Sequence, residues 1–492
     1  MKSDIIVIGA GASGLMAAYG AAKTLSDAGH PVQVSLLEKM PRPARKVMIT
    51  GKGRCNFTNV KPWNEFSEHI RSKQNFLRPA YQNLTPLSLT AFLNEAGLET
   101  VVERGDRAFP ASHRASDVVD ALVRMVLAVG VKILTDCEVL SVSGSAGSGG
   151  AAVVSGSAGS VGSAVTSGSA GSFTIECADG QKHYCSRLII ATGGLSYPGT
   201  GSTGDGYAWA EGFGHSLAPL FPSLTALVPR GYKTEPYISR GKGHIDRGTP
   251  LSSLGQALCG VQLKNVSLTS VIENCEAESE FGDLDFTDGG IEGPLGFRLS
   301  RKCVKSLING SRVKLRLDLK HGVPEDELRG RVSQLWREIK DDPRSRGVGD
   351  KELCRILLGK LMPRELIPGF LASFPDIISV ERKAGVKDRF GKYSVGKARV
   401  FVHLTQIADA LKRWDFEIAG FVGYERAVVT SGGVKTEELT AKTLESRIVP
   451  GLYFCGELVD IDADTGGYNL HCAFSTGLLA GQSAAKSLLC RQ

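Results

Sequence analysis

The stretch DIIVIGAGASG, residues 4–14, decides the fold of this chain. Its apolar start predicts a short buried strand, after which glycines recur with the spacing Gly9-x-Gly11-x-x-Gly14. In such a turn the first glycine permits the tight bend, the second lets backbone approach a pyrophosphate, and the third allows close packing. The alanine-rich segment Ser13–Leu25 then predicts a helix, whose N-terminus stabilises phosphate charge. The stretch therefore predicts a dinucleotide site.

The segment after this helix supports a dinucleotide without a 2′-phosphate. Val32–Leu37 predicts a second strand, and Glu38 ends it at about the offset of ~20 residues expected for an acid that binds ribose hydroxyls. This acid favours FAD or NAD. The spacing recurs at Gly199-x-Gly201-x-x-Gly204, but no apolar strand precedes it. We interpret that second match as a glycine-rich loop rather than a nicotinamide site.

Bulk properties limit the classes of protein to which the chain can belong. Its 492 residues predict two or three domains. The net charge of +7 permits an anionic partner such as a nucleic acid, although a solvated basic surface gives the same value. Eleven scattered cysteines without a CxxC pair fit neither a zinc cluster nor a disulfide framework, so we expect no metal site and a reducing, cytoplasmic location. No apolar run approaches the ~20 residues of a membrane span, and Asp4 argues against a leader.

The order of predicted elements indicates an α/β fold whose two ends combine. Residues 1–213 form the first part of the dinucleotide-binding domain and include a strand at Val131–Val142. Residues 214–415 predict an inserted domain of short strands and helices, and residues 416–492 return to the pattern of the start. Within the first part, the uncharged repeat Ser143–Ser172 predicts a flexible low-complexity loop.

A dense polar loop, GKGRCNFTN at residues 51–59, follows the Glu38 strand. Such a loop can place a cation on a phosphate or a flavin oxygen, and Arg45 and Lys46 lie just upstream. Cys55 is a candidate proton donor, because the pKa of a thiol can be tuned. A small buried residue that packs on the flavin is the alternative for Cys55.

A second polar segment lies between a predicted strand, Leu452–Cys455, and the last predicted helix, Leu470–Leu489. Its carboxylates can bind ribityl hydroxyls, and the start of the helix can stabilise negative charge on a reduced flavin. An acidic helix cap is the alternative. We expect His471 and Cys472 to serve packing rather than chemistry. The segment comprises Gly456, Glu457, Asp460, Asp462, Gly466, Gly467, Tyr468, Asn469 and Leu470.

Five long blocks, in the expected order, together resemble the BaiN/RdsA flavoproteins, also called the YhiN family. The resemblance covers nearly the whole chain, from Gly9 to Gly481. These blocks are MITGKGRCNFTN (48–59), IIATGGLSYPGTGSTGDGYAWAEGFGH (189–215), FTDGGIEGPLGFRLS (286–300), AVVTSGGVKTEEL (427–439) and GLYFCGELVDIDADTGGYNLHCAFSTG (451–477). The resemblance implies a two-part, glutathione-reductase-like Rossmann-type FAD domain with inserted β-rich and helical subdomains. It also implies that NADH or NADPH reduces non-covalently bound FAD.

Two activities are associated with the family, and both add a hydride and a proton across an activated ring C=C bond. One reduces uridine to dihydrouridine in 23S ribosomal RNA, and the other reduces bile-acid intermediates. We favour the RNA because the chain is basic, and Arg298, Arg301 and Lys302 are candidate phosphate contacts or simply a solvated face. A small-molecule ene-reductase and a non-enzymatic flavin redox sensor are the alternatives. We expect no membrane association and infer no stable protein partner.

The resemblance assigns site residues to positions of this sequence. The catalytic candidates are Cys55, Arg54, Asn56 and Tyr468. The residues expected to bind the cofactor are Gly9, Gly11, Ala12, Ser13, Gly14, Glu38, Lys39, Lys46, Gly51, Arg54, Val139, Ala191, Thr192, Gly193, Gly456, Glu457, Asp462, Gly467, Tyr468, Asn469 and Leu470. The chain departs from the family in the Ser143–Ser172 insertion, in His471 where relatives often have glutamine, and in Arg382–Lys397, which fits no block.

Overall fold

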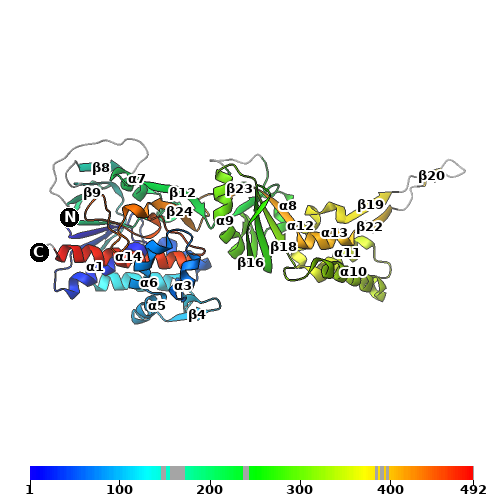
Figure 1. Ribbon diagram of the computed structural model, residues 1–492, viewed down its shortest axis with the longest axis horizontal. Coiled ribbons are helices and arrows are strands. Elements are labelled where there is room, and N and C mark those ends of the chain that lie inside the picture. The colour runs from blue at the N-terminus through cyan, green and yellow to red at the C-terminus, as the bar shows by residue number, and fades with distance from the viewer. Residues whose placement is uncertain are drawn as a thin grey trace. The chain divides into compact units, whose positions relative to one another are not determined.

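A computed structural model shows two compact units (Figure 1). The first unit comprises residues 1–224 and 424–492, and the second comprises residues 225–423. The observed boundaries lie beyond the predicted ones at 214 and 415, because Leu217–Ser223 is a strand of the first unit and Trp414–Val422 is a strand of the second. The structure describes residues 1–145, 151–155, 172–235, 243–382, 386–387, 393–394 and 398–490.

A five-stranded parallel sheet forms the centre of the first unit, with the order β25-β11-β1-β2-β6. Every residue of β1, β2 and β11 is buried, which explains why these strands are continuous apolar runs rather than alternating ones. β2, which follows β1 in the chain, pairs with one edge of β1, and β11 pairs with the other edge, so the strand order reverses at β1. The strands are β1 Ile5–Ile8, β2 Val34–Leu37, β6 Lys132–Leu134, β11 Arg187–Ile190 and β25 Leu452–Phe454.

Two long helices from opposite ends of the sequence, α1 and α14, lie side by side in this unit (Figure 1). They approach closely because small residues face each other: a Cβ on Gly481 would overlap the carbonyl oxygen of Ala17. This contact joins the two parts of the first unit. The helices are α1 Ala12–Asp27, α2 Arg45–Met48, α3 Trp63–Phe66, α4 Gln74–Asn83, α5 Pro86–Glu95, α6 Ala115–Ala128, α7 Asp205–Gly212 and α14 Gly466–Leu489.

Three smaller sheets complete the first unit, with the orders β10-β9-β7-β8, β3-β5-β4 and β12-β24. Their strands are β3 Thr58–Asn59, β4 Thr100–Glu103, β5 Arg107–Pro110, β7 Val139–Ser145, β8 Ala151–Ser155, β9 Phe173–Cys177, β10 Lys182–Cys185, β12 Leu217–Ser223 and β24 Val429–Val434.

Two sequence predictions in this region are wrong. The predicted strand Val131–Val142 is two strands in two sheets, β6 and β7, because Asp136 between them has a left-handed backbone with a φ of 52°. The predicted loop Ser143–Ser172 contains β8, which pairs antiparallel with β7. Residues 146–150 and 156–171 of that loop lie outside the described residues.

The second unit contains a seven-stranded sheet with the order β13-β17-β16-β15-β18-β23-β14, and an additional β13–β23 pairing closes six of these strands into a ring. Its strands are β13 Leu227–Pro229, β14 His244–Ile245, β15 Gln262–Ile272, β16 Cys275–Thr287, β17 Gly290–Glu292, β18 Val313–Asp318 and β23 Trp414–Val422. The ring confirms that the insert is rich in strands.

A group of helices and short strands completes the second unit. The helices are α8 Ser253–Leu258, α9 Gly293–Ile308, α10 Glu325–Asp341, α11 Asp350–Leu361, α12 Ile367–Ser373 and α13 Leu404–Lys412. The short strands are β19 Ile378–Arg382, β20 Val386–Lys387, β21 Tyr393–Ser394 and β22 Ala398–Val402. Apart from β20 and β21, residues 383–397 of the segment that fits no family block lie outside the described residues.

Candidate cofactor and active site

A pocket lies in the first unit where the central sheet meets the starts of α1 and α14. The ends of β1 and β2 and the residues after β11, Ala191 to Gly193, contribute to its lining. This is the carboxyl edge of a parallel sheet at the point where strand order reverses, the usual place for a ligand in such folds. The lining extends from Glu38 at the end of β2, past the glycine turn, to Gly466 at the start of α14. The pocket therefore connects the sites at which the sequence predicts binding of a dinucleotide.

The glycine turn forms the middle of the pocket. Gly9 has a φ of +96°, and a Cβ on Gly14 would overlap the carbonyl oxygen of Gly9, so both positions need glycine. Gly11 differs, because a Cβ there would meet no atom within 4 Å and would instead fill pocket space. The first backbone N–H groups of α1 have no partner within the helix and form an anion site. This hollow therefore fits a pyrophosphate.

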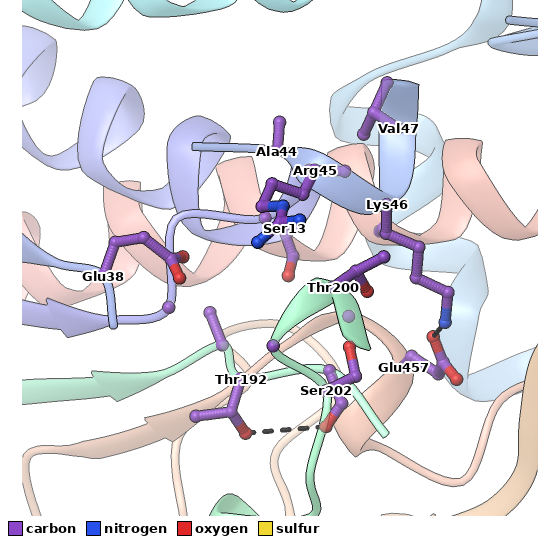
Figure 2. A pocket seen from close by; sticks show the side chains of 18 of the residues that line it. Ser13, Glu38, Ala44, Arg45, Lys46, Val47, Thr192, Thr200, Ser202 and Glu457 are labelled. Atoms are coloured by element: carbon purple, nitrogen blue, oxygen red, sulfur yellow. Dashed lines mark hydrogen bonds and ion pairs between the residues drawn. The ribbon is translucent and has the colours of Figure 1, made fainter. Parts of the chain in front are cut away.

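Glu38 lies at one end of the pocket (Figure 2). Its carboxylate accepts hydrogen bonds from the backbone N–H of Ala10 at 2.8 Å and of Met40 at 2.9 Å. Burial raises the pKa of Glu38, although these two bonds oppose the shift. The carboxylate is thus fixed beside the glycine turn, where an acceptor for ribose hydroxyls is expected. Arg42 and Arg45 also line the pocket, and the charge of Arg45 acts on Glu38 to lower its pKa.

The opposite end of the pocket holds an ion pair between Lys46 and Glu457 (Figure 2). The Lys46 Nζ lies 2.7 Å from Glu457 Oε2. The other carboxylate oxygen, Oε1, accepts hydrogen bonds from Ser196 Oγ at 2.6 Å and from the backbone N–H of Thr430 at 2.7 Å. Because β24 supplies Thr430 and the segment after β25 supplies Glu457, this network joins several parts of the first unit.

The start of α14 forms a further wall, through Gly466, Asn469 and Leu470. No side chain caps this helix end. The Asn469 side chain instead accepts from the backbone N–H of Ala463 at 3.1 Å and donates to the carbonyl oxygens of Ala463 and Thr465. It therefore holds the turn before the helix, and it leaves the helix N-terminus available to stabilise an anionic group in the pocket.

The donor set as a whole fits FAD. At one end of the pocket, a carboxylate can accept hydrogen bonds from a ribose. In the middle, a glycine turn and a helix N-terminus can bind a pyrophosphate. The N-terminus of a second helix can stabilise a flavin ring that becomes anionic. The predicted residues that line this pocket are Gly9, Gly11, Ala12, Ser13, Glu38, Lys39, Lys46, Val139, Ala191, Thr192, Gly193, Gly456, Glu457, Asn469 and Leu470.

Other lining residues were not expected from the sequence. Thr200, Gly201 and Ser202 belong to the second glycine motif, which we interpreted as a plain loop but which borders the same pocket. Its dense glycine and polar composition was the available signal. Arg42 and Val429 also line the pocket, and nothing in their local sequence distinguished them.

The predicted residues that do not line the pocket are Gly14, Gly51, Arg54, Cys55, Asn56, Asp462, Gly467 and Tyr468. All four catalytic candidates belong to this group. The Cys55 side chain is fully buried, and burial raises its pKa to about 11. Arg54 forms an ion pair with Glu103 and lies over the Phe109 ring, 4.4 Å from its centroid. In this conformation the side chains of Arg54 and Cys55 therefore contact residues outside the pocket.

Tyr468 and Asn56 pack beside the start of α14. A Cβ on Gly467 would overlap the Asn56 amide, so the polar loop lies directly against this helix end. Tyr468 is only 2% exposed, stacks on His69 with centroids 4.3 Å apart, and has a pKa raised by burial. Asp462 is also buried and accepts a hydrogen bond from Ser72 Oγ at 2.9 Å. These residues therefore build the wall behind the pocket.

His471 and Cys472 differ from each other in placement. His471 is fully buried, lies 3.0 Å from Thr58 Oγ1 through its Nδ1, and has a pKa lowered by burial to about 3. A neutral imidazole at this position serves packing, as expected. Cys472 lines the pocket, and burial raises its pKa. Among the described residues, no helix combines the length and the apolar character needed to cross a membrane.

Comparisons with known proteins identify the family. The model of the HI0933-like protein Rossmann domain matches residues 3–483. The 3-dehydro-bile acid delta(4,6)-reductase of Clostridium scindens is 30% identical over 480 residues, which are 98% of this chain and 98% of that protein. The ribosomal RNA dihydrouridine synthase of Haemophilus influenzae is 27% identical over 98% of this chain and 99% of its own length. That of Escherichia coli is 28% identical over 99% of both.

These matches span nearly the whole chain, and they agree with the Rossmann-type fold and with the glycine-turn pocket. The resemblance seen in the five sequence blocks is confirmed. The chain therefore belongs to the HI0933-like family, and it is an FAD-dependent oxidoreductase.

Proposed function

We propose that this oxidoreductase reduces the ring double bond of a uridine in 23S ribosomal RNA to give dihydrouridine. The names of two relatives motivate the proposal, and the distribution of charge favours it. Residues 225–423 contain 33 Lys and Arg against 26 Asp and Glu, whereas the first unit contains 25 of each. The entire excess of +7 is thus in the inserted unit. A polyanionic substrate accounts for this segregation, because phosphate contacts dominate the affinity for nucleic acids.

The helices α10 and α11 supply the best candidates for phosphate contacts. Cations on these helices and on the turn that follows are exposed: Arg331, Arg337, Lys351, Lys360 and Arg364. The candidates suggested by the sequence are less suitable. Arg298 forms an ion pair with Glu280 at 3.1 Å, and Lys302 donates to the carbonyl oxygen of Ala277 at 2.8 Å. Both therefore already have partners within the unit.

In the proposed reaction, the pocket residues bind and orient the cofactor and the rest of the chain positions the substrate. When bound, FAD supplies the hydride chemistry, with NADH or NADPH as the proposed donor. Glu38 would accept from the adenosine ribose, and the turn at Gly11 with the start of α1 would hold the pyrophosphate. The Lys46–Glu457 pair and the start of α14 would fix charge near the flavin ring. Cys55 remains the candidate proton donor only if its loop opens.

The decisive experiment measures dihydrouridine in RNA. An Escherichia coli strain that lacks its own ribosomal RNA dihydrouridine synthase is complemented with this chain, and 23S RNA fragments are analysed by mass spectrometry. We expect one uridine to regain the mass of two hydrogens. If no uridine changes while the purified protein still carries FAD, the RNA assignment is wrong. Success in that strain would also agree with the proposed cytoplasmic location.

Charge variants test the role of the inserted unit. Neutralising Arg331, Arg337, Lys351 and Lys360 together to Gln should reduce RNA modification and flatten its salt dependence while FAD content stays unchanged. The control removes four exposed cations from the charge-neutral unit: Arg78, Arg104, Arg124 and Lys132. Equal losses in both variants would show that the inserted unit has no special affinity for RNA.

A second function, reduction of a steroid-like enone, is favoured by one observation. Of the three relatives named above, the bile-acid reductase has the highest identity to this chain, 30% against 27% and 28%. The test supplies the purified FAD-loaded protein with NADH or NADPH and a 3-oxo-Δ4,6 bile acid. Turnover of this compound without any RNA modification would make the small-molecule function the better one.

A further inference from the structure

Three potential metal ligands meet on one face of the four-stranded sheet β10-β9-β7-β8. Cys137 lies just before β7, Cys177 is the last residue of β9, and His183 lies in β10. Cys177 is paired with Val139 of β7, and its backbone N–H donates to Gln181 at 3.0 Å just before His183. Residues that lie opposite each other on adjacent strands, or two positions away from that, have neighbouring side chains. The sheet therefore brings together three side chains that are far apart in sequence.

The geometry of this cluster is tight. The Sγ atoms of Cys137 and Cys177 lie 3.2 Å apart, and one ligand atom from each of the three residues lies within 4.8 Å of the others. Cys177 and His183 are buried and Cys137 is half-buried. Among the described residues, the buried Nδ1 of His183 has no hydrogen-bond partner. An unsatisfied buried nitrogen is costly, so this one indicates a missing partner.

We propose that Cys137, Cys177 and His183 form a binding site for a thiophilic d10 cation, Zn²⁺ or Cu⁺. Two sulfur ligands and one imidazole suit such ions, whereas Mg²⁺ and Ca²⁺ require oxygen ligands. Zn²⁺ accepts three protein ligands and leaves a fourth position open, as in catalytic zinc sites, and Cu⁺ is selected by thiolates. Binding would displace the thiol protons into solvent, because the thiolate is the ligand.

The site has a structural consequence for the cofactor pocket. Two residues here line that pocket: Cys137, in the segment between β6 and β7, and Val139, the first residue of β7. A cation held by all three ligands would tie this segment to the β9–β10 hairpin and restrict its motion. FAD would then bind a pocket wall that is already ordered. The inference stands on the cluster alone and is independent of the substrate proposed above.

The test uses the FAD-loaded, full-length protein, with Zn²⁺ and Cu⁺ as separate probes. Reduced protein is dialysed against each ion in the presence of a competing chelator, and bound metal is measured by mass spectrometry. We expect one ion per chain for at least one of the two probes. In Cys137→Ser and in His183→Asn, the affinity should fall by more than the roughly 10–100-fold caused by loss of an outer-shell partner.

The matched control is Cys185→Ser, which removes a buried thiol from the same strand as His183 but lies outside the cluster. This control should bind metal like the unmodified protein, and circular dichroism confirms folding in every variant. Equal metal binding by Cys137→Ser and the unmodified protein would overturn the proposal. So would quantitative formation of a Cys137–Cys177 disulfide on mild oxidation in a protein that retains neither ion, because the pair would then be a redox couple.

Discussion

Two glycine-containing segments of the first unit differ in how they meet the cofactor pocket. The turn Gly9–Gly14 lines it directly, with Gly11 facing empty space. The polar loop at residues 51–59 contributes no residue to the lining, and its central thiol, Cys55, is fully buried. The first segment is held between a strand and a helix in one geometry. The second contains three consecutive left-handed residues from Gly51 to Gly53, a backbone that neither strand nor helix maintains.

This difference shows which contacts determine the side to which the groups of a loop point. In the glycine turn, the parallel pairing of β1 with β2 and β11 fixes the start and helix α1 fixes the end, so the backbone N–H groups face the sheet edge. The polar loop is instead fixed by distant partners. The Phe57 backbone N–H donates to Ala108 at 3.0 Å, and Asn56 lies against Gly467. Variants in the two segments should therefore fail in different ways.

The largest effect is expected from Gly11→Val. Because Gly11 has a φ of −74°, its backbone tolerates a side chain, and no atom lies within 4 Å of the new Cβ. The apoprotein should keep its stability, but the side chain would occupy the hollow for the pyrophosphate. Overpacking of a fitted site costs about 1–3 kcal/mol, so FAD affinity should fall by roughly 5–150-fold. Fluorescence titration with FAD measures it.

Gly330→Ala, in α10 of the second unit, is the control, because a Cβ there also meets no atom within 4 Å. It should bind FAD normally. If Gly11→Val binds FAD as well as the unmodified protein does, the hollow is not the pyrophosphate site and the contrast between the two segments fails.

A smaller effect is expected from the ion pair at the far end of the pocket. Lys46→Met leaves the partly buried Glu457 with its two hydrogen-bond donors but without its counterion. Since one partner of a partly buried pair contributes about 1 kcal/mol, FAD affinity should fall about 5-fold. The double variant Lys46→Met/Glu457→Gln should recover part of the loss, as measured by a double-mutant cycle. Additive losses would show that the two residues act separately.

The sequence predicted those parts of the site that local geometry determines. Gly9, Gly11, Gly14 and Glu38 have fixed spacings because a strand, a turn and a helix impose them. It could not predict which way the Cys55 loop would face, because residues in β5 and α14 decide that.

The metal-ligand cluster was missed for a related reason. Zinc sites are recognised in a sequence from cysteines a few positions apart. Cys137 and Cys177 are 40 positions apart and meet only through strand pairing. The same limit applies to Ala151–Ser155, where a low-complexity composition concealed a strand that pairs with β7. Long-range pairing is thus the information that local patterns lack.

Cys55→Ala separates a packing role from a catalytic role. Since the thiol is fully buried outside the pocket, we expect a loss of stability of about 1–2 kcal/mol and little change in either half-reaction. Stopped-flow measurements follow flavin reduction and flavin reoxidation by substrate separately. A fall of about 10²–10⁴-fold in reoxidation only would instead identify Cys55 as the proton donor and would require the loop to open during turnover.

The smallest effect, a change in pH dependence, concerns His471, which joins the polar loop to α14. His471 on α14 contacts Thr58, which lies near the end of the polar loop, and burial lowers the pKa of His471 to about 3. In the unfolded chain the pKa is about 6.5, so between those values only the unfolded state gains a proton. The neutral buried form therefore supports stability fully above pH 6.5, and this contribution declines as the pH falls toward 3.

His471→Gln removes the titrating group and keeps a side chain that can bond to Thr58. The free energy of unfolding of the unmodified protein should decline by up to about 1.4 kcal/mol per pH unit more steeply than that of the variant below pH 6. Urea unfolding at a series of pH values measures the two slopes. Parallel slopes would mean that His471 is protonated in the folded protein, and the wall between the polar loop and α14 would then be open to water.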